Sequence, residues 1–558
     1  MDNKSIAKRF KLYGQLMELL GENPFRTKAI TSAAFKIDKL PFAAEKASLE
    51  ELSEQPGIGK STAERIKLII QSGTLPELDK LLEQVPEGVQ EMLQIKGLGP
   101  KKMQIIWKTL EIESIGELYY ACNENRLVEA KGFGLKTQEE IKKNIEFAIA
   151  NQGWVLFAKA IPFAEATYEA LQKSFPDNQL VFTGDYRRKS EVLQFIDFSI
   201  DLPQHVLVST LENKDYVLQV DADRESVHFK DDNNISYRIF TSSPEDFAKN
   251  LLITTGSSEH LDLLAHIQQE IPDGKSEEEI YTALGLSYIE PELREGFNEV
   301  DLAKDNQLPQ LITNEDILGT LHNHSTYSDG VHSLELMARY CKEEMNLQYL
   351  GICDHSKTAV YANGLTIERL EDQWKEIDQL NEQLAPFKIF KGIESDILGD
   401  GSLDYPDEIL AKFDFVVASI HSNLGMTEEK ATERLIKAIE NPYTTILGHP
   451  TGRLLLSRAG YPIDYKKVID ACAANQVVIE INANPLRLDL DWRWHRYALQ
   501  KGVLLSINPD AHRMEGFHDM QYGVLAGRKG GLSADKCLNA FNLEQIQSFF
   551  EERKVRKG

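Results

Sequence analysis

The part of this chain that is most informative about its fold is the segment His322-Asn323-His324-Ser325-Thr326-Tyr327-Ser328-Asp329-Gly330. It follows the apolar run Ile317 to Leu321, which predicts a buried strand, so its two histidines should lie where a strand ends and a loop begins. In a barrel of parallel strands the reactive groups gather at that end of the strands. The segment therefore predicts a functional site at the carboxyl end of a barrel strand.

The same pattern, an apolar run followed by a polar group, recurs down the chain. Amphipathic stretches such as Ser333 to Glu344 and Thr427 to Glu440 fall between the runs, which is the alternation expected of parallel strands and crossover helices. With Ile317 to Leu321 the runs number seven and predict a βα barrel of about seven strands. The other six are Leu347 to Cys353, Phe387 to Ile393, Phe413 to Ile420, Thr444 to Gly448, Val477 to Ile481 and Val503 to Ile507.

Metal-ligand side chains stand at the ends of these runs. Imidazole and carboxylate together suit Zn, Mn or Fe, and the set is larger than one ion needs, so we expect two or three divalent ions with Glu394 as a bridging ligand. Clustered ions activate bound water and neutralise the oxygens of a phosphate ester, which predicts phosphoester hydrolysis. Arg453 and Arg458 are further candidates, for binding a substrate phosphate. The nine ligands are His322, His324, Asp329, His355, Glu394, His421, His449, Asp510 and His512.

Residues from about 316 to 556 resemble a PHP (polymerase and histidinol phosphatase) domain. The resemblance rests on the segments HxH with SDG, DH, GIES, SIH, GHP and DAH, which occur in that order. It implies a trinuclear metal site in a catalytically competent domain. Each ligand position of the family pattern is filled in this chain.

The N-terminal third contains three copies of a glycine-paired loop, each followed by a helical stretch. The loops are Pro56 to Lys60, Lys96 to Lys102 and Lys131 to Lys136. Paired glycines allow close approach to another backbone, and the following helix directs its first N–H groups outward as a phosphate site. The loops resemble the helix-hairpin-helix motif, which binds the DNA backbone without regard to sequence. The expected DNA-binding residues are Gly57, Gly59, Lys60, Arg65, Gly97, Gly99, Lys101, Lys102, Gly132, Gly134 and Lys136.

The first hairpin, with Asn23 to Arg26 upstream, is similar to the start of a family-X DNA polymerase. Some members of that family carry a lyase lysine in the motif GxGxxxAEK. Here the motif reads Gly57 to Arg65 (GIGKSTAER), with arginine at the lysine position. A guanidinium stays protonated and forms no Schiff base, so we expect Arg65 to bind phosphate and not to act as a lyase.

The middle of the chain resembles the palm and thumb of the same family. Thr183 to Arg188 is similar to the GSxRR triphosphate loop, and Thr254 to Ser257 to the family's TGS. Tyr281 to Leu286 and Pro291 to Gly296 are similar to the closing thumb segment of prokaryotic members. The resemblance to a bacterial family-X DNA polymerase with a C-terminal PHP domain thus covers nearly the whole chain.

The polymerase chemistry itself is expected to be lost. Nucleotidyl transfer needs a DxD pair and a third aspartate to hold two Mg²⁺ ions. Two of these three aspartates are missing here, so we expect no Mg²⁺ in this palm. The first aspartate is replaced by Phe195 and the third by Ser236, and an acidic residue replaces the serine of the triphosphate loop. The alternative is a misaligned strand, since Glu191 and Asp201 lie nearby. The degenerate site comprises Gly184, Asp185, Arg187, Phe195, Asp197 and Ser236.

Length and composition indicate a multidomain protein. A chain of 558 residues exceeds a single core, and no run of 18 apolar residues or N-terminal apolar signal occurs, so we expect a cytoplasmic protein without a membrane partner. Its five cysteines lack CxxC spacing. The expected divisions are two helix-hairpin-helix domains (1–88 and 89–150), a degenerate palm (151–240), a thumb (241–300), a linker (301–315) and the PHP domain (316–558).

Charge is distributed unevenly along the chain. Residues 1–145 have a net charge of +1 and the remaining residues have a net charge of −26, which together give the total of −25. Bulk attraction does not bring so acidic a body onto nucleic acid, so any DNA contact has to be local and made through the backbone. No obligate protein partner is indicated.

These features predict a DNA-repair protein that hydrolyses phosphoesters at gapped DNA or free 3′ ends. The resemblance implies a Mn²⁺-dependent 3′–5′ exonuclease, with end-cleaning and abasic-site cleavage as related reactions. The alternatives are a small-molecule phosphatase of the histidinol-phosphate type, a still-active gap-filling polymerase, and a DNA-end binding module with a structural metal cluster. The hairpins argue against the phosphatase, and the surplus of ligands argues against a closed structural site.

Overall fold

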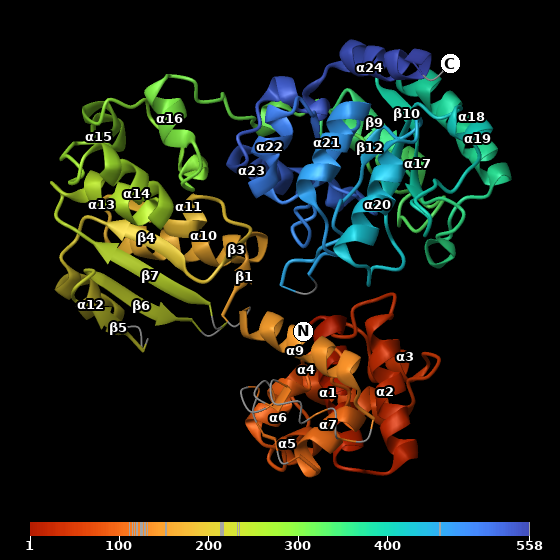
Figure 1. Ribbon diagram of the computed structural model, residues 1–558. Helices are drawn as coiled ribbons and strands as arrows, with labels where there is room; N and C mark the ends of the chain where they lie inside the picture. Colours follow the sequence, from red (N-terminus) through yellow and green to blue (C-terminus); the bar gives the residue numbers. More distant parts are fainter. Residues whose placement is uncertain are drawn as a thin grey trace. The chain divides into compact units, whose positions relative to one another are not determined.

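The chain forms two compact units, Met1–Gln152 and Gly153–Gly558, in the computed structural model (Figure 1). The structure describes residues 1–110, 112–113, 115, 118, 121–122, 127, 130, 132–150, 153–212, 217–231, 233, 235–456 and 459–556. Among these residues, none of the helices combines the length and apolar character needed to cross a membrane.

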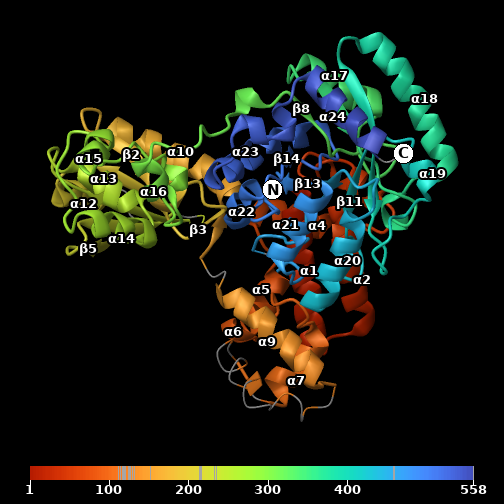
Figure 2. The same cartoon turned by 45° about the horizontal axis from the view of Figure 1, so that its top comes forward.

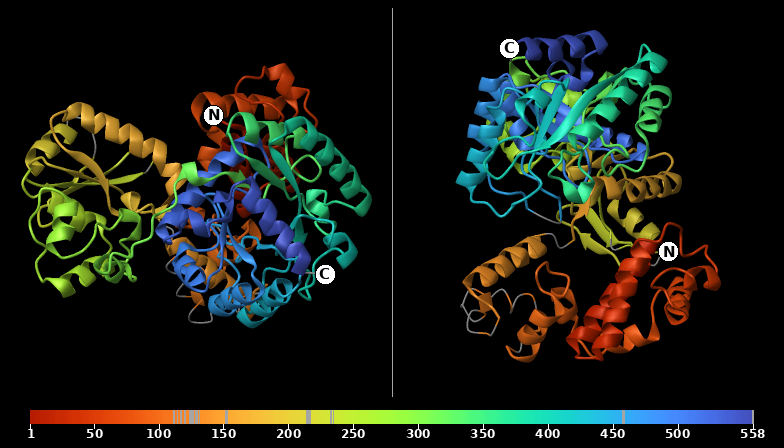
Figure 3. Two further views of the ribbon diagram at one scale, coloured as in Figure 1. Left: turned by 90° about the horizontal axis from the view of Figure 1, so that it is seen from above. Right: turned by 90° about the vertical axis from the view of Figure 1, so that its right-hand side faces the viewer.

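The first unit is helical throughout its described part, drawn in red and orange in Figure 3. Helix α1 packs along α2, and the two bury one apolar face that includes Phe10, Leu16 and Ile37. Short helices complete a single core beneath the glycine loops. The helices are α1 Asn3–Leu19, α2 Pro24–Asp38, α3 Leu49–Ser53, α4 Lys60–Ser72, α5 Pro76–Leu82, α6 Glu87–Met92, α7 Pro100–Lys108 and α9 Leu135–Ala150.

The three glycine loops share one backbone design. The first glycine of each has a positive φ, of +86° at Gly57, +88° at Gly97 and +96° at Gly132. The apolar residue between the glycines is buried, and its N–H donates to the carbonyl three residues earlier. The second glycine leads into α4, α7 or α9. The glycine loop that leads into a helix is therefore present three times, as expected from the sequence; Lys131 and most of the segment before the third loop lie outside the described residues.

The second unit begins with a five-stranded sheet of order β2-β4-β7-β6-β5 and a two-stranded sheet of β1 and β3. Strands β4 and β7 are parallel, and their register places Asp197 opposite Arg238. The aromatic cluster of Phe182, Tyr186 and Phe198 fills the core. The elements are β1 Val155–Leu156, α10 Phe157–Ser174, β2 Leu180–Thr183, α11 Gly184–Arg187, β3 Val192–Leu193, β4 Ile196–Ile200, α12 Gln204–Glu212, β5 Gln219–Asp221, β6 Ser226–Lys230 and β7 Ser236–Thr241.

A small helical subdomain with its own apolar core follows this sheet. At its centre the buried His260 makes hydrogen bonds at 2.9 Å with both Glu299 and Tyr281. An ion pair of Arg187 in α11 with Glu277 connects the subdomain to the sheet, and Arg294 pairs with the same Glu277 from within the subdomain. Its elements are α13 Phe247–Thr255, α14 Ser258–Ile267, α15 Glu277–Ala283, η1 Pro291–Leu293 and α16 Glu299–Lys304.

A seven-stranded parallel sheet of order β14-β13-β12-β11-β10-β9-β8 forms the rest of the unit. Its two edges meet through a bridge between Asn323 and Ala511, so the sheet nearly closes into the expected barrel. All seven expected strands occur. They are β8 Gly319–Thr320, β9 Tyr349–Ile352, β10 Lys388–Asp396, β11 Phe415–Ser419, β12 Ile446–Leu447, β13 Val478–Asn482 and β14 Leu505–Asn508.

Helices enclose these strands, and Figure 2 shows the long α18 at their outer edge. The two amphipathic stretches named above form α17 and α20, which confirms their prediction. The helical elements are η2 Asn314–Asp316, α17 Leu334–Glu343, η3 Val360–Ala362, α18 Ile367–Leu384, α19 Asp407–Leu410, α20 Glu428–Ile439, α21 Tyr465–Asn475, η4 Trp492–Trp494, α22 His495–Gln500, η5 Met514–Asp519, α23 Met520–Lys529, η6 Ala534–Lys536, η7 Leu538–Ala540 and α24 Leu543–Arg556.

Side chains alternate between two cores along the barrel strands. On β11, Phe415 and Val417 join an inner cluster, whereas Val416 and Ala418 pack with the helices. The inner cluster is completed by Phe550 of α24, which stacks on Phe415 near the start of the strand. Because α24 covers the amino-terminal end of the barrel, the carboxyl end is left for the polar residues that follow each strand.

Candidate metal centre

The structure brings all nine expected ligands together at the carboxyl end of the barrel. Successive strands supply them because every parallel strand ends at the same rim. Three groups have ligand atoms within 4.8 Å of one another. They are His324, Asp329, His355 and His512; His322, His324 and Asp510; and His355, Glu394 and His421.

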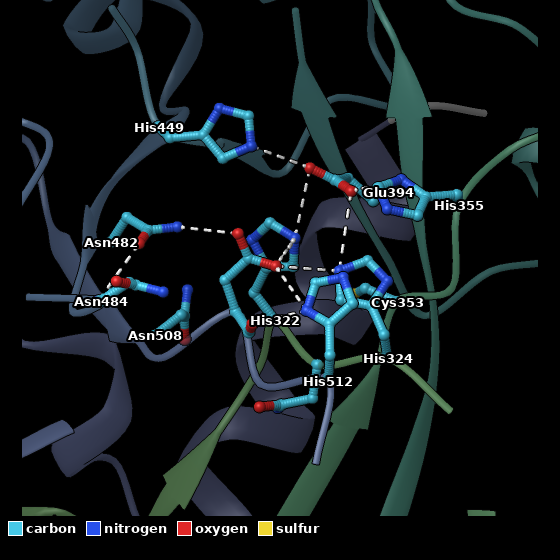
Figure 4. A network of polar contacts seen from close by, with 12 residues as sticks. His322, His324, Cys353, His355, Glu394, His449, Asn482, Asn484, Asn508 and His512 are labelled. Carbon is cyan, nitrogen blue, oxygen red and sulfur yellow. Dashed lines mark hydrogen bonds and ion pairs between the residues drawn. The ribbon is translucent and has the colours of Figure 1, made fainter. Parts of the chain in front are cut away.

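Glu394 occupies the middle of the cluster (Figure 4). Its Oε1 lies 3.1 Å from Nε2 of both His421 and His449 and 3.3 Å from Nε2 of His322. Its Oε2 lies 2.8 Å from Nδ1 of His355. One carboxylate therefore faces imidazoles from four strand ends, which is the arrangement that a ligand bridging two ions requires. His449 joins the cluster through this contact and through its ring, which lies 5.1 Å from that of His421 and 6.0 Å from that of His322.

The opposite side of the cluster is formed by Asp510 and Asp329. Oδ1 of Asp510 lies 3.0 Å from Nε2 of His324 and 3.7 Å from Nε2 of His322. Oδ1 of Asp329 lies 3.3 Å from Nε2 of His512 and 3.6 Å from Nε2 of His355. Carboxylates thus alternate with imidazoles through the whole site.

The donor atoms of the cluster fit divalent metal ions. His322 Nε2, His324 Nδ1 and Glu394 Oε2 are buried and meet no hydrogen-bond partner of good geometry among the described residues. Buried polar atoms are rarely left in this state, and several of them converging on one space indicate a ligand. Nitrogen and oxygen donors in this proportion suit Zn, Mn or Fe, and the geometry does not select among them.

Electrostatics favours cations in the cluster. Burial opposes ionisation of Glu394, but His421, His322 and His355 hold its pKa well below the usual range. Burial acts in the same way on Asp329, whose contact with His512 nevertheless lowers its pKa to about 2. The carboxylates are therefore anionic at neutral pH and attract metal ions.

Two ligands are oriented by carboxylates that the sequence argument did not identify. His322 Nδ1 lies 2.7 Å from Oε2 of Glu480, and His421 Nδ1 lies 2.6 Å from Oδ1 of Asp396. Such contacts fix the ring so that Nε2 faces the site. A signal existed for both, because Glu480 interrupts an apolar run and Asp396 shares a face of β10 with Glu394.

A third unidentified carboxylate, Asp354, shapes the loop that carries Asp329. It is fully buried, and it accepts hydrogen bonds from the backbone N–H and hydroxyl groups of Ser325 and Ser328 and from the amide of Gln373. The SDG segment is thereby wrapped around one buried anion.

Arg453 does not point toward the metal cluster as a phosphate ligand would. Its Nη1 donates to Asp491 at 2.6 Å, and its Nε and Nη2 donate to the carbonyl oxygens of Arg487 and Leu488. All three nitrogens are therefore engaged in holding neighbouring loops. Arg458 lies outside the described residues.

Phe195 and Ser236, the two positions at which the sequence predicts lost carboxylates, directly precede the paired residues Ile196 and Tyr237 of β4 and β7. Phe195 and Asp197 are two residues apart at the start of β4, and Ser236 and Arg238 are their neighbours on β7. Arg238 binds Asp197 through two hydrogen bonds of 2.8 and 3.0 Å, and its guanidinium lies 4.9 Å from the ring centroid of Phe195. The salt bridge between Asp197 and Arg238, next to the ring of Phe195, therefore occupies this part of the sheet.

Neighbouring groups close the palm site further. Gly184 lies directly against Asp197, since a Cβ there would come within 2.0 Å of Oδ2. Asp185 pairs with Arg188, and Arg187 binds Glu277 through both terminal nitrogens. Burial raises the pKa of Asp197 to about 6 although Arg238 opposes the shift. At neutral pH this carboxylate is ionised and neutralised by the arginine.

Several of the expected DNA-binding lysines lie at the exposed tips of the hairpins. Lys60, Lys101 and Lys136 are exposed at the starts of α4, α7 and α9. Arg65 is turned along the helix and contacts Ser61 and Glu77, the latter at 3.4 Å. The lysines are therefore the better placed of the cationic candidates for a phosphate contact.

Comparison with known proteins agrees with this architecture. Family models match at residues 1–75 (helix-hairpin-helix domain), 89–146 (SAM-like helix-hairpin-helix tandem), 263–295 (DNA polymerase beta thumb) and 320–484 (PHP domain). The DNA polymerase/3′-5′ exonuclease PolX of Bacillus subtilis (strain 168) is 36% identical over 99% of this chain and 100% of its own length. A probable phosphatase of Thermoanaerobacter sp. (strain X514) is 28% identical over 42% of this chain and 96% of its own length.

Proposed function

This chain belongs to the family of bacterial PolX proteins, and we propose that its PHP domain is a Mn²⁺-dependent 3′–5′ exonuclease acting in DNA repair. The observation that carries the proposal is the gathering of nine ligand side chains, Glu394 among them, in a chain that also has DNA-type hairpins. Gapped DNA and DNA with free 3′ ends are the proposed substrates. End-cleaning and cleavage at abasic sites belong to the same chemistry.

The protein residues contribute orientation and charge to this reaction. Bound divalent ions would supply Lewis acidity to the scissile phosphodiester. Glu394, Asp329 and Asp510 offset the charge of the ions, and Glu480 and Asp396 hold His322 and His421 with Nε2 toward them. The hairpin tips bind the sugar-phosphate backbone through lysines and backbone N–H groups.

We also propose that the palm has lost nucleotidyl transfer. Support comes from the replacement of two metal-binding aspartates by Phe195 and Ser236 and from the pairing of the remaining Asp197 with Arg238. The alternative carboxylates are committed elsewhere. Glu191 binds Trp492 and Arg493, and Asp201 accepts from Asn178 and Gln179.

The decisive experiment follows a DNA strand with a free 3′ end in the presence of Mn²⁺. Wild type, Glu394→Ala and Asp197→Ala are compared for degradation of this labelled strand. We expect the Glu394 variant alone to lose degradation, and no variant to extend a primer with Mg²⁺ or Mn²⁺. Template-directed extension by the wild type would refute the loss of polymerase activity.

The small-molecule phosphatase remains the competing function because probable phosphatases match the barrel region. The hairpins are the feature that such an enzyme would not use. If the wild type leaves DNA intact but releases phosphate from small phosphomonoesters, the phosphatase becomes the better assignment. DNA would then be a bound regulator and not the substrate.

A further inference from the structure

The palm reaches the barrel through a buried carboxylate that the proposed chemistry does not use. Glu191, between α11 and β3, is 7% exposed. Its Oε2 accepts the indole N–H of Trp492 at 2.9 Å, and its Oε1 accepts from Nη1 of Arg493 at 2.8 Å. Both partners belong to the segment that follows β13 of the barrel. A palm carboxylate is thus the acceptor for two neighbouring barrel residues.

From Glu191 a row of alternating charges continues into the barrel loops. Arg493 also contacts Asp491 at 3.0 Å, and Asp491 accepts from Arg453 at 2.6 Å. Arg453 is four residues beyond His449 and ties its own loop to the carbonyls of Arg487 and Leu488. The row therefore joins the palm to the loop that carries one metal ligand.

The loop of His449 requires such support. His449 has a φ of +22°, a backbone conformation that residues other than glycine rarely adopt without external restraint. Two residues later, the backbone N–H and hydroxyl of Thr451 both donate to Asp489, at 2.9 and 3.0 Å. The segment around Asp489 and Asp491 thus holds the loop of His449 in place. Glu191 binds the end of that segment, at Trp492 and Arg493.

We propose that Glu191 is a positioning residue for the metal centre, acting through Arg493, Asp491 and Arg453 on the loop of His449. In this view the palm serves as the outer support of the barrel's metal site, a role that explains the retention of a folded palm. The inference rests on the proposed function only where activity is measured. Metal affinity tests it independently.

The test measures Mn²⁺ binding and the Mn²⁺ concentration that gives half-maximal exonuclease activity in the full chain. Glu191→Gln keeps the size of the side chain and removes its charge. We expect a several-fold weaker Mn²⁺ affinity, less than the about 10–100-fold loss seen when direct partners of metal ligands are changed. The matched control is Glu292→Gln. Glu292 is also 7% exposed and joins the thumb-like subdomain to the barrel through Arg528 at 2.8 Å, but among the described residues it makes no hydrogen bond to the loops of the metal ligands.

A second variant cuts the same row from the barrel side. Arg493 is about half exposed, so Arg493→Gln should leave the fold intact. We expect it to weaken Mn²⁺ binding as Glu191→Gln does, and the double variant to be no weaker than either single one, because both break one row. Unchanged Mn²⁺ affinity in folded Glu191→Gln, or an equal loss in Glu292→Gln, would overturn the inference. Absence of exonuclease activity in the wild type would instead refute the proposed function and leave the binding result valid.

Discussion

At the scale of single residues, the metal centre depends on carboxylates behind the ligands as well as on the ligands. Asp396 holds His421 at 2.6 Å and also accepts the hydroxyl of Thr358 at 2.8 Å. It contributes no ligand atom to the three clusters. Its role is to fix which nitrogen of His421 faces the site, so that it would affect the bound metal only indirectly.

Asp396→Asn should therefore raise the Mn²⁺ requirement by about 10–100-fold, since an amide can present the wrong group to His421. The measurement is a Mn²⁺ titration of exonuclease activity together with direct Mn²⁺ binding. Asp404→Asn is the matched control, because Asp404 accepts the backbone N–H of the same Thr358 at 2.7 Å without touching a ligand. Equal effects of the two substitutions would indicate a general disturbance of the loop.

The buried His260 makes the stability of the thumb-like subdomain dependent on pH. Burial lowers its pKa below the usual value even though Glu299 favours the proton. The unfolded chain takes up a proton near pH 6.5 and the folded one does not, so stability is full above that pH and is lost as the pH falls below it. Because His260→Gln has no such group, its melting temperature should fall less than that of wild type between pH 7 and 5.5. If the melting temperatures of wild type and His260→Gln fall equally with pH, each taken relative to its value at pH 8, the prediction is wrong.

Residues differ in how far the sequence reveals them. The nine ligands could be predicted because they stand at or shortly after the ends of apolar runs, and strand ends meet at one rim. Their supports are only partly visible in the sequence. Glu480 stands out because it interrupts an apolar run, but its pairing with His322, like that of Asp491 with Arg453, is set by packing between distant segments. Arg453 was expected to hold a phosphate from its place after His449, and only the fold shows that its nitrogens are taken.

At the scale of elements, the hairpins illustrate two separate uses of glycine. Gly57 and Gly97 have positive φ, so the fold itself requires them. Gly59 and Gly99 have ordinary extended angles, with φ of −80° and −73°, and a Cβ on either would meet nothing within 4 Å. The fold does not demand glycine at these second positions. A ligand that approaches the start of the helix closely would require glycine there, because a side chain would block the approach.

The double variant Gly59→Ala and Gly99→Ala should therefore weaken DNA binding about tenfold or more while changing the melting temperature little. Binding to a gapped duplex and thermal unfolding are the two measurements. Gly73→Ala is the control for backbone strain, because Gly73 has a φ of +79° at the end of α4, away from the loop tip. Unchanged DNA affinity in the double variant would remove the hairpins from the binding surface.

The sequence pattern predicted the strands and helices of the barrel closely, but it specified the strands of the palm less well. Apolar runs and amphipathic periods locate strands and helices that alternate, as with α17 and α20. The palm strands are short and mixed in direction, so their register depends on pairing that no local pattern specifies. The pairing of Asp197 with Arg238 across β4 and β7 was accordingly not foreseen.

At the scale of the whole molecule, charge is divided between the two units. Residues 153–558 carry the whole net charge of −25, and residues 1–152 are neutral overall. The hairpins lie in the neutral unit, so their local contacts with phosphate are opposed at a distance by the acidic remainder. This repulsion is screened once the Debye length, about 10 Å at 0.1 M salt, becomes shorter than the separation of the charges.

Full-length protein should consequently show a weaker dependence of DNA affinity on salt than the fragment 1–152, which has its own apolar core. Salt weakens the phosphate contacts of both proteins, but in the full chain it also screens the repulsion, and the two effects partly cancel. The measurement is the slope of log affinity against log salt on one gapped duplex, between about 0.05 and 0.3 M. Circular dichroism of the fragment checks that it is folded. Equal slopes would mean that the acidic unit exerts no field on the bound DNA, and the hairpins would then work independently of the remainder of the chain.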